Sequence, residues 1–308
     1  MDIKIGGVVM EKCNLCPRNC RVDRSKGERG LCGAGWNPKV ALASLHQWEE
    51  PCLVGENGAG TVFFSHCNLQ CVFCQNQEIS QQHQGIEVSE ERLIEIFLEL
   101  QEKGAASIDL VTPTHYVPVI AAALKVAKKN GLTLPVVYNS NGYESEAAIE
   151  MLRGLIDIFL PDFKYIDEES ACRYSAAPQY FRYASAAVAK MVELAGPPVF
   201  SGETLKRGVI VRHLILPGHA KESMRIVEWL WTTFGDRIYL SLMNQFTPLY
   251  KVEAYPEINR CLTTYEYDKV VDYAWDLGIR QCFIQEGRTS LEKFVPQFDG
   301  SGVKAAAR

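Results

Sequence analysis

The sequence lacks the features of a membrane or exported protein. None of its apolar runs reaches the roughly eighteen residues that a membrane span requires. The first residues, MDIKIGGVVMEKC, do not form a signal peptide, because their apolar stretch is short and ends at Glu11 and Lys12. We therefore expect a cytoplasmic protein without a membrane span.

An excess of positive charge is also missing. The formal net charge of −5 argues against broad, non-specific nucleic-acid binding, although a local basic patch stays compatible with it. Hydrophobic residues make up 47% and charged residues 22%, which is ordinary for a globular protein. At 308 residues the chain is long enough for one large α/β domain or two smaller ones.

Disulfide bonds are not expected. The eleven cysteines are an odd number and no export signal accompanies them, so clustered cysteines indicate metal ligands instead. Two clusters stand out: Cys13, Cys16, Cys20 and Cys32 form the first, and Cys67, Cys71 and Cys74 the second. We expect the remaining cysteines, Cys52, Cys172, Cys261 and Cys282, to be buried free thiols.

Three zones follow one another along the chain. Residues 1–45 are rich in cysteine, arginine and glycine, and we expect them to form a metal-binding head. Residues 46–285 alternate short β-branched runs with longer amphipathic stretches. Residues 286–308 end in DGSGVKAAAR, and we expect this tail to be partly disordered.

Six short apolar runs in the middle zone predict β-strands. They lie at residues 61–65, 107–112, 134–139, 156–162, 208–214 and 237–243. The clearest helical pattern between them begins with a cap at Ser89 and stops at Gly104. Strands that alternate with helices predict an α/β fold with parallel strands and right-handed crossovers. Either a partial barrel or a doubly wound sheet fits, and both bind ligands at the carboxyl ends of their strands.

The segment SHCNLQCVFCQN directly follows the first predicted strand. Its three cysteines, Cys67, Cys71 and Cys74, are close enough in sequence for their thiolates to bind one iron–sulfur cluster. Three ligands leave one iron open, and an open coordination position is what lets a metal centre act on a substrate. A zinc site completed by His66, or three buried cysteines without a metal, are the alternatives.

The pattern C-x3-C-x-aromatic-C after a first strand resembles the radical S-adenosylmethionine superfamily. The form CVFCQN is similar to C-x-Y-C-H-N in the activating enzymes of glycyl-radical enzymes, and the resemblance covers roughly residues 55–250. It implies a partial (β/α)6 barrel with an N-terminal cysteine-rich metal-binding extension. It also implies a [4Fe-4S] cluster on Cys67, Cys71 and Cys74, with S-adenosyl-L-methionine on the open iron.

The ends of the later predicted strands extend the resemblance. The family motif D-T-N-G is similar to Asn139-Ser140-Asn141-Gly142, and the family motif D-L-K resembles Asp162-Phe163-Lys164. A further family strand resembles VIVRHLILPG, and this match implies that Arg212 lies near the methionine carboxylate. The cofactor-binding residues that it implies are Phe73, Asn139, Asn141, Asp162, Lys164 and Arg212. Thr112-Pro113-Thr114-His115 stands where the family has a Gly-Gly-Glu-type motif, and His115 and Tyr116 are candidate catalytic residues.

The N-terminal cysteines follow the spacing C-x2-C-x3-C-x11-C. Four ligands suffice for a structural zinc ion or for a saturated auxiliary iron–sulfur cluster. Because this zone has little apolar core of its own, it is expected to need a metal to fold, although free thiols stay an alternative. Its arginines form either a docking face for an anionic partner or an ordinary solvated surface.

The function implied by the resemblance is reductive cleavage of S-adenosylmethionine to a 5′-deoxyadenosyl radical that takes a hydrogen atom from a substrate. The substrate is a glycyl-radical enzyme, which the chain would activate, or alternatively a small molecule, a peptide, a lipid or RNA. The implied partners are an electron donor of the flavodoxin or ferredoxin type and a glycyl-radical protein. A metal-binding scaffold without catalysis would leave the strand-end Asn, Asp, Lys and Arg residues unexplained.

Overall fold

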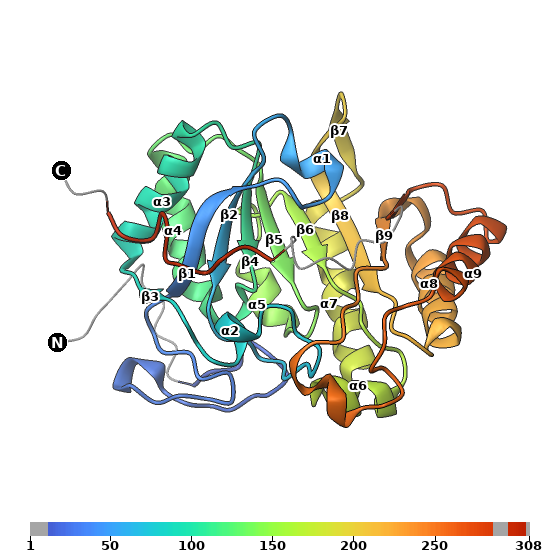
Figure 1. The fold of residues 1–308 in the computed structure, drawn as a ribbon. Helices are drawn as coiled ribbons and strands as arrows, with labels where there is room; N and C mark the ends of the chain where they lie inside the picture. The colour runs from blue at the N-terminus through green and yellow to red at the C-terminus, as the bar shows by residue number, and fades with distance from the viewer. Residues whose placement is uncertain (1–11, 286–294, 306–308) are drawn as a thin grey trace.

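A computed structural model describes residues 12–285 and 295–305 of the chain. Its centre is one sheet whose strands follow the order β10-β9-β8-β6-β5-β4-β2-β1-β3. The path does not return to its first strand, so the sheet is an open, partial barrel with helices packed on its outer side (Figure 1). The prediction of an α/β fold with a mostly parallel sheet is confirmed.

All six predicted strands are present and run parallel to one another. They are β2 (Ala59–Phe64), β4 (Ile108–Val111), β5 (Val136–Ser140), β6 (Ile158–Pro161), β8 (Thr204–Leu214) and β9 (Tyr239–Met243). Every residue of β2, β4, β5 and β6 is buried. Continuous apolar runs are typical of parallel strands that are covered on both faces, which is why these strands could be predicted.

Four further strands extend this sheet. β1 (Lys39–His46) pairs antiparallel with β2 and β3 (Ile86–Glu87) with β1, while β10 (Cys282–Ile284) lies parallel to β9. β7 (Val199–Ser201) forms a hairpin with β8. Because β1 begins at Lys39, the boundary between the N-terminal head and the barrel lies before this strand, not at residue 45 as expected.

Helices connect the parallel strands. They are α1 (Pro51–Val54), α2 (Gln77–Ser80), α3 (Glu90–Glu102), α4 (Val117–Lys129), α5 (Glu146–Glu150), α6 (Glu168–Ser175), α7 (Tyr180–Ala195), α8 (Ala220–Phe234) and α9 (Thr264–Asp276). The predicted cap of α3 is confirmed, because the Ser89 hydroxyl accepts a hydrogen bond from the backbone N–H of Arg92 at 3.2 Å. Among the described residues no helix is long and apolar enough to span a membrane.

The two ends of the barrel differ. At one end α1 places Cys52 and Leu53 against Val137, Ile158 and Ile210, so apolar side chains close the barrel interior there. At the other end lie α2 and, in dark blue, the N-terminal segment (Figure 1). We call residues 12–38 the head; its only regular element is a short 3-10 helix, Arg24–Lys26.

Residues 295–305 of the tail that was expected to be partly disordered pack against β1. The Ala43 N–H donates to the Ser301 carbonyl at 2.9 Å and the Gly300 N–H to the Ala41 carbonyl at 3.0 Å, so the tail runs along β1. Arg92 on α3 donates to the carbonyls of Val303 at 2.9 Å, Gly302 at 3.1 Å and Lys304 at 3.2 Å. Residues 286–294 and 306–308 lie outside the described part of the chain.

The unclustered cysteines are not all buried. Cys52 is buried and Cys282 is half-buried on β10, whereas Cys172 and Cys261 are exposed. The expectation of burial is therefore wrong for these last two. Cys172 is on the outer, amphipathic helix α6, and Cys261 lies in the loop before α9, so neither position faces a core.

Candidate functional site

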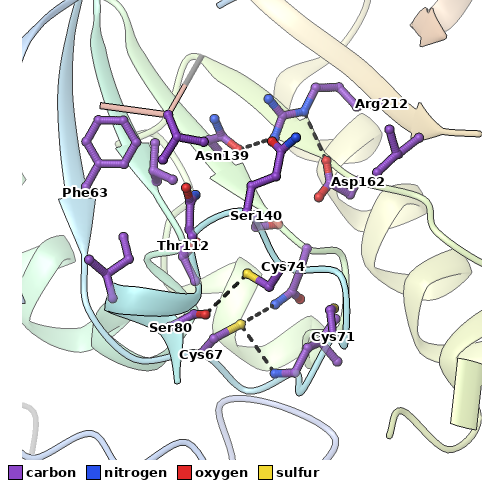
Figure 2. A pocket seen from close by; sticks show the side chains of 18 of the residues that line it. Phe63, Cys67, Cys71, Cys74, Ser80, Thr112, Asn139, Ser140, Asp162 and Arg212 are labelled. Carbon is purple, nitrogen blue, oxygen red and sulfur yellow. Dashed lines mark hydrogen bonds and ion pairs between the residues drawn. The ribbon is translucent and has the colours of Figure 1, made fainter. Parts of the chain in front are cut away.

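A cavity of about 220 Å³ lies at the carboxyl ends of the parallel strands. Its wall includes all nine residues that the sequence assigned to the cluster and to S-adenosylmethionine: Cys67, Cys71, Cys74, Phe73, Asn139, Asn141, Asp162, Lys164 and Arg212. Figure 2 shows the three cysteines on one side of this space and Arg212 with Asn139 and Asp162 on the other. The barrel topology explains the gathering, because the carboxyl ends of parallel strands meet at one edge.

The cysteines stand on a loop, residues 66–76, that we call the cysteine loop. It leaves β2 through His66, whose φ of 75° lies in the left-handed region and turns the chain sharply after the strand. The Val72 N–H donates to the Tyr174 carbonyl at 2.9 Å and the Gln70 N–H to the Ser175 carbonyl at 3.2 Å. These bonds fix the middle of the loop to the end of α6.

Each sulfur of the cysteine loop has a polar neighbour. Cys67 Sγ accepts hydrogen bonds from the Leu69 N–H and the Asn141 side-chain amide, both at 3.4 Å. The Ser175 hydroxyl donates to Cys71 Sγ at 2.9 Å, and Cys74 Sγ lies 3.3 Å from Ser80 Oγ. Donors of this kind stabilise electron-rich sulfur, as in the thiolate ligands of a metal centre.

Burial keeps the three thiols protonated when no metal is bound. It raises the pKa of Cys67 to about 12 and that of Cys71 to about 11, and it also raises the pKa of Cys74. Lys164 opposes the effect at Cys71, because its ammonium favours a nearby thiolate. A metal centre that replaces these protons would therefore release them into solution.

Asp162, Lys164 and Arg212 form a buried charged group opposite the cysteines. Lys164 Nζ donates to Asp162 Oδ2 at 2.7 Å, and Arg212 Nε donates to Asp162 Oδ1 at 3.1 Å. Burial alone would raise the pKa of Asp162, but the two cations outweigh it and hold that pKa below its usual value. At neutral pH this group therefore carries one anion and two cations, which suits a ligand with a carboxylate.

A second layer of acidic residues lies behind Arg212, and the sequence analysis missed it. Arg212 Nη1 lies 3.6 Å from Glu49 Oε2, and Arg212 Nη2 donates to Asn139 Oδ1 at 2.5 Å. Asn139 in turn donates to Asp109 Oδ2 at 3.2 Å. Burial raises the pKa of Asp109 to about 6 and that of Glu49 well above its usual value, and the nearby Asp109 carboxyl adds to the rise at Glu49.

A weak signal for this layer was present in the sequence. Asp109 interrupts an otherwise apolar strand, and a charged residue inside a buried parallel strand needs a partner. Glu49 could not be found in this way, because it lies in the segment before α1 and reaches the cavity wall only through the folded structure.

The turn after β5 requires glycine. Gly142 has φ of 74°, and a Cβ placed on it would lie 2.5 Å from the carbonyl oxygen of Asp162. The Tyr180 hydroxyl approaches the carbonyls of Asn141 and Asp162, at 2.8 and 3.0 Å. This close approach of two backbones positions Asn141, whose amide also donates to Asn68 Oδ1 at 2.7 Å.

The predicted catalytic roles of His115 and Tyr116 need correction. Neither residue lines the cavity, and both are buried in the 3-10 turn Thr114–Tyr116. His115 Nε2 is 2.8 Å from the Ser65 carbonyl, and burial lowers its pKa to about 3, so it is a neutral packing residue. The chain turns away from the cavity at Thr112, whose φ is 58° where the resemblance expects a glycine-containing motif.

The rest of the wall is apolar or amide-bearing. Phe73 is buried against Phe246, with ring centroids 5.7 Å apart, and Gln75 donates to the Gln245 carbonyl at 3.0 Å. Val295 and Pro296 of the tail also face the cavity. No pattern in the sequence indicated that the tail lies here.

The head packs against the base of the cysteine loop. Arg18 Nε donates to the Asn68 carbonyl at 3.0 Å, the Ser145 N–H donates to the Leu15 carbonyl at 3.2 Å, and His66 Nδ1 is 3.1 Å from the Cys32 carbonyl. Within residues 12–285 and 295–305, no three His, Cys, Asp or Glu side chains surround one point closely enough for a single metal ion. This holds for both cysteine clusters, and a four-iron cluster is wider than one ion and holds its sulfurs further apart.

Two curated relatives are proteins of Methanocaldococcus jannaschii without an assigned function. The uncharacterized protein MJ0674 is 30% identical over 89% of this chain and 77% of its own length. The uncharacterized protein MJ0808 is 25% identical over 46% of both chains. Neither relative supplies a substrate.

Among solved structures, the chain is similar in fold to Streptococcus suis SuiB. With SuiB bound to its precursor peptide SuiA, the TM-score is 0.51 at 15% identity, over 72% of this chain. The match spans only 46% of SuiB, about half of its length.

A sequence model of the radical SAM superfamily matches residues 61–230, which is more than half of the chain. The match begins inside β2, runs through the cysteine loop and the strand ends that line the cavity, and stops within α8. Its extent, together with the open, mostly parallel barrel, identifies the fold and the class of enzyme: the chain belongs to the radical S-adenosylmethionine superfamily.

Proposed function

We propose that Cys67, Cys71 and Cys74 bind a [4Fe-4S] cluster and that the opposite side of the cavity binds S-adenosylmethionine. The observation that supports this proposal most directly is that one cavity is lined both by three thiols from one loop and by the group of Asp162, Lys164 and Arg212. The bound cluster, once reduced, supplies the electron that divides S-adenosylmethionine into methionine and a 5′-deoxyadenosyl radical, which removes a hydrogen atom from a substrate.

The residues present fit such a cluster. Three sulfurs face the cavity and carry hydrogen-bond donors, while no fourth cysteine lines it. Three protein ligands are what an iron with an open position requires. In this proposal Asn141 orients Cys67, Ser175 orients Cys71, and Ser80 orients Cys74.

Each polar residue has a binding role in this proposal. Arg212 and Lys164 hold the carboxylate of the methionine end, because they are the cations that face the cavity. Asp162 keeps both cations in place, and Asn139 and Asn141 offer amides to the ribose and the amino group. Phe73 packs beside the adenine and, with Phe246 behind it, excludes water.

S-adenosylmethionine needs the space of this cavity, about 220 Å³, so the proposal places the substrate at the cavity mouth. The resemblance of CVFCQN to the activating enzymes of glycyl-radical enzymes favours a glycyl residue of a partner protein as that substrate. Modification of a peptide, small molecule or lipid is the alternative, and RNA modification would need steep salt dependence of binding.

The experiment for the cofactor is a cleavage assay. The chain is reconstituted anaerobically with iron and sulfide, reduced with dithionite and given S-adenosylmethionine, and 5′-deoxyadenosine is measured by chromatography. We expect product from the wild type and from Cys172→Ala, which changes an exposed cysteine, but only background from Cys71→Ala. Equal product from Cys71→Ala would refute the cluster assignment.

The experiment for the substrate uses deuterium. Cells that naturally produce the chain are grown with α-deuterated glycine, and their protein and small-molecule fractions are added separately to the assay. Glycyl-radical activation predicts deuterium in 5′-deoxyadenosine from the protein fraction. If only the small-molecule fraction stimulates cleavage, and the protein fraction transfers no deuterium to 5′-deoxyadenosine, the substrate is a small molecule and glycyl-radical activation is refuted. Radical SAM enzymes need a reductant, and we expect flavodoxin or ferredoxin to substitute for dithionite.

A further inference from the structure

The head holds four free thiols on a loop that has almost no regular structure. Cys13 and Cys32 are buried, while Cys16 and Cys20 are half-buried. The loop is closed by hydrogen bonds from the Cys13 N–H to the Val22 carbonyl and from the Arg21 N–H to the Cys13 carbonyl, both 3.0 Å long. A segment so poor in apolar side chains and regular elements commonly depends on a bound metal for its fold.

The backbone of the head brings its cysteines together. The Arg21 N–H donates to the Cys13 carbonyl at 3.0 Å, which places Cys20 beside Cys13. Cys20 Sγ in turn packs against Gly30, two residues before Cys32, because a Cβ on Gly30 would collide with that sulfur. Cysteines that are up to nineteen residues apart in the sequence therefore belong to one small loop.

A buried cation points toward this group of thiols. Arg24 is 5% exposed, its Nη2 lies 3.4 Å from Cys32 Sγ, and its Nη1 donates to the His115 carbonyl. No carboxylate in the described part of the chain forms an ion pair with Arg24, and its Nε has no hydrogen-bond partner. A buried guanidinium without a counter-charge is costly, because its lost hydration is not replaced.

Metal-bound thiolates would supply the missing negative charge. Metal binding removes the proton from each cysteine, so four ligands place their charge beside Arg24. A single zinc ion, with Zn–S distances of about 2.3 Å, would require the sulfurs to surround one point, and no such group exists among the described residues. The same holds for Cys67, Cys71 and Cys74, which the proposed function assigns to an iron–sulfur cluster.

We propose that Cys13, Cys16, Cys20 and Cys32 bind a second iron–sulfur cluster, saturated by four thiolates and compensated by the buried Arg24. The inference rests on the proposed function in that it treats both cysteine groups as cluster sites.

The second site adjoins the first. The Asn68 Oδ1 lies 3.9 Å from Cys67 Sγ, and its Nδ2 donates to the Tyr143 carbonyl at 2.6 Å. The Asn68 carbonyl accepts a hydrogen bond at 3.0 Å from Arg18, two residues after Cys16, so Asn68 contacts both cysteine segments. The two clusters are neighbours across Asn68, and the head is part of the same metal-bearing end of the barrel.

The experiment separates the two sites by substitution. Cys67→Ala, Cys71→Ala and Cys74→Ala are combined to remove the first site, and the variant is reconstituted anaerobically with iron and sulfide. We expect about four irons per chain in this triple variant and about eight in the wild type. The reduced triple variant should give a paramagnetic resonance signal that S-adenosylmethionine does not change, because a four-thiolate cluster has no open iron.

The complementary variant carries Cys16→Ala and Cys32→Ala. It should lose the paramagnetic resonance signal of the head cluster and keep the signal of the first cluster, which S-adenosylmethionine changes. Cys172→Ala with Cys261→Ala, at exposed positions, serves as the control with about eight irons. If the wild type binds about four irons per chain and the triple variant binds none, the second cluster is refuted. The proposed function is not affected by that result. One zinc ion per chain in the triple variant would also overturn it.

A further substitution tests the role of Arg24 and does not depend on how well the cysteine variants fold. Arg24→Gln should lower the reduction potential of the signal that is insensitive to S-adenosylmethionine, because a buried positive charge favours the added electron. Arg29→Gln, at an exposed arginine of the same loop, should leave that potential unchanged. Equal potentials in Arg24→Gln and the wild type would contradict the proposed charge compensation.

Discussion

Arg212 links the two buried layers of charge. Its guanidinium contacts Asp162, Asn139 and Glu49, and it is the cation closest to the Glu49 and Asp109 carboxyls. Arg212→Met leaves these acidic groups without compensation, so we expect the free energy of unfolding to fall by about 3–5 kcal/mol. Urea denaturation of the apoprotein measures the change.

The control for Arg212 is Arg153→Met. Arg153 forms ion pairs with Glu150 and Glu193, but its side chain is 53% exposed, so its loss should change stability by less than about 1 kcal/mol. Combining Arg212→Met with Asp162→Asn should cost less than the sum of the two single changes. Equal losses for the Arg212 and Arg153 variants would show that the buried layer does not depend on Arg212.

Glu144 gives the fold a defined pH dependence. It is buried, it accepts hydrogen bonds from Thr114 and Tyr138, and burial raises its pKa from 4.5 to about 7. Because the folded pKa is raised, the stabilisation is complete below pH 4.5 and is lost as the pH rises to about 7. The loss is on the order of 3 kcal/mol.

Glu144→Gln removes this titration. Relative to the variant, we expect the wild type to lose about 3 kcal/mol of unfolding free energy between pH 4.5 and pH 7, measured by urea denaturation. Glu146→Gln, at an exposed position two residues further on, should keep the wild-type pH profile. Parallel profiles for Glu144→Gln and the wild type would contradict the assignment.

At the scale of single elements, the residue that follows β4 has a backbone conformation that favours glycine, although it is a threonine. Thr112 has φ of 58°, which costs a residue with a Cβ about 1–2 kcal/mol. We expect Thr112→Gly to raise the free energy of unfolding by up to about 1 kcal/mol, after the entropy that glycine adds to the unfolded chain. Thr232→Gly, on the exposed side of α8, should lower it. A loss of stability in Thr112→Gly would mean that its side chain matters more than its backbone.

The elements that the sequence predicted well are those with a strong local signal. The parallel strands could be predicted because buried strands such as IFLP are continuously apolar, and α3 because Ser89 caps an amphipathic stretch. α7 was missed although Ala184, Val188, Met191 and Ala195 form a helical stripe. β1 was missed because it follows the cysteine-rich zone and is ordered by pairing with β2, a tertiary contact.

The residues of the site likewise divide into those that the sequence predicted and those that it could not predict. The nine cavity residues at strand ends followed from the motif and from the rule that parallel strands deliver their ends to one edge. Glu49 and the tail residues Val295 and Pro296 could not be predicted, because they reach the cavity through contacts between distant segments. His115 was misplaced because a strand-end position does not show which way the following turn points.

At the scale of the whole molecule, Arg92 fastens the tail to the barrel. It donates to three tail carbonyls and binds Glu99 from α3. We expect Arg92→Ala to release residues 295–305 and to lower the exchange protection of the Ala43 amide, which donates to Ser301, by at least about tenfold. Hydrogen exchange read by mass spectrometry checks this. Amides of β5 should keep their protection, and an unchanged Ala43 would show that the tail holds without Arg92.

Val295 and Pro296 follow the entire barrel in the chain, yet they complete the cavity wall. During synthesis the cysteines therefore leave the ribosome long before that wall can close. Under the proposed function, iron and sulfide would reach the nascent cysteine loop before this part of the wall is in place. The order of the segments in the gene would then match an order of assembly in which the cluster binds before the cavity wall is complete.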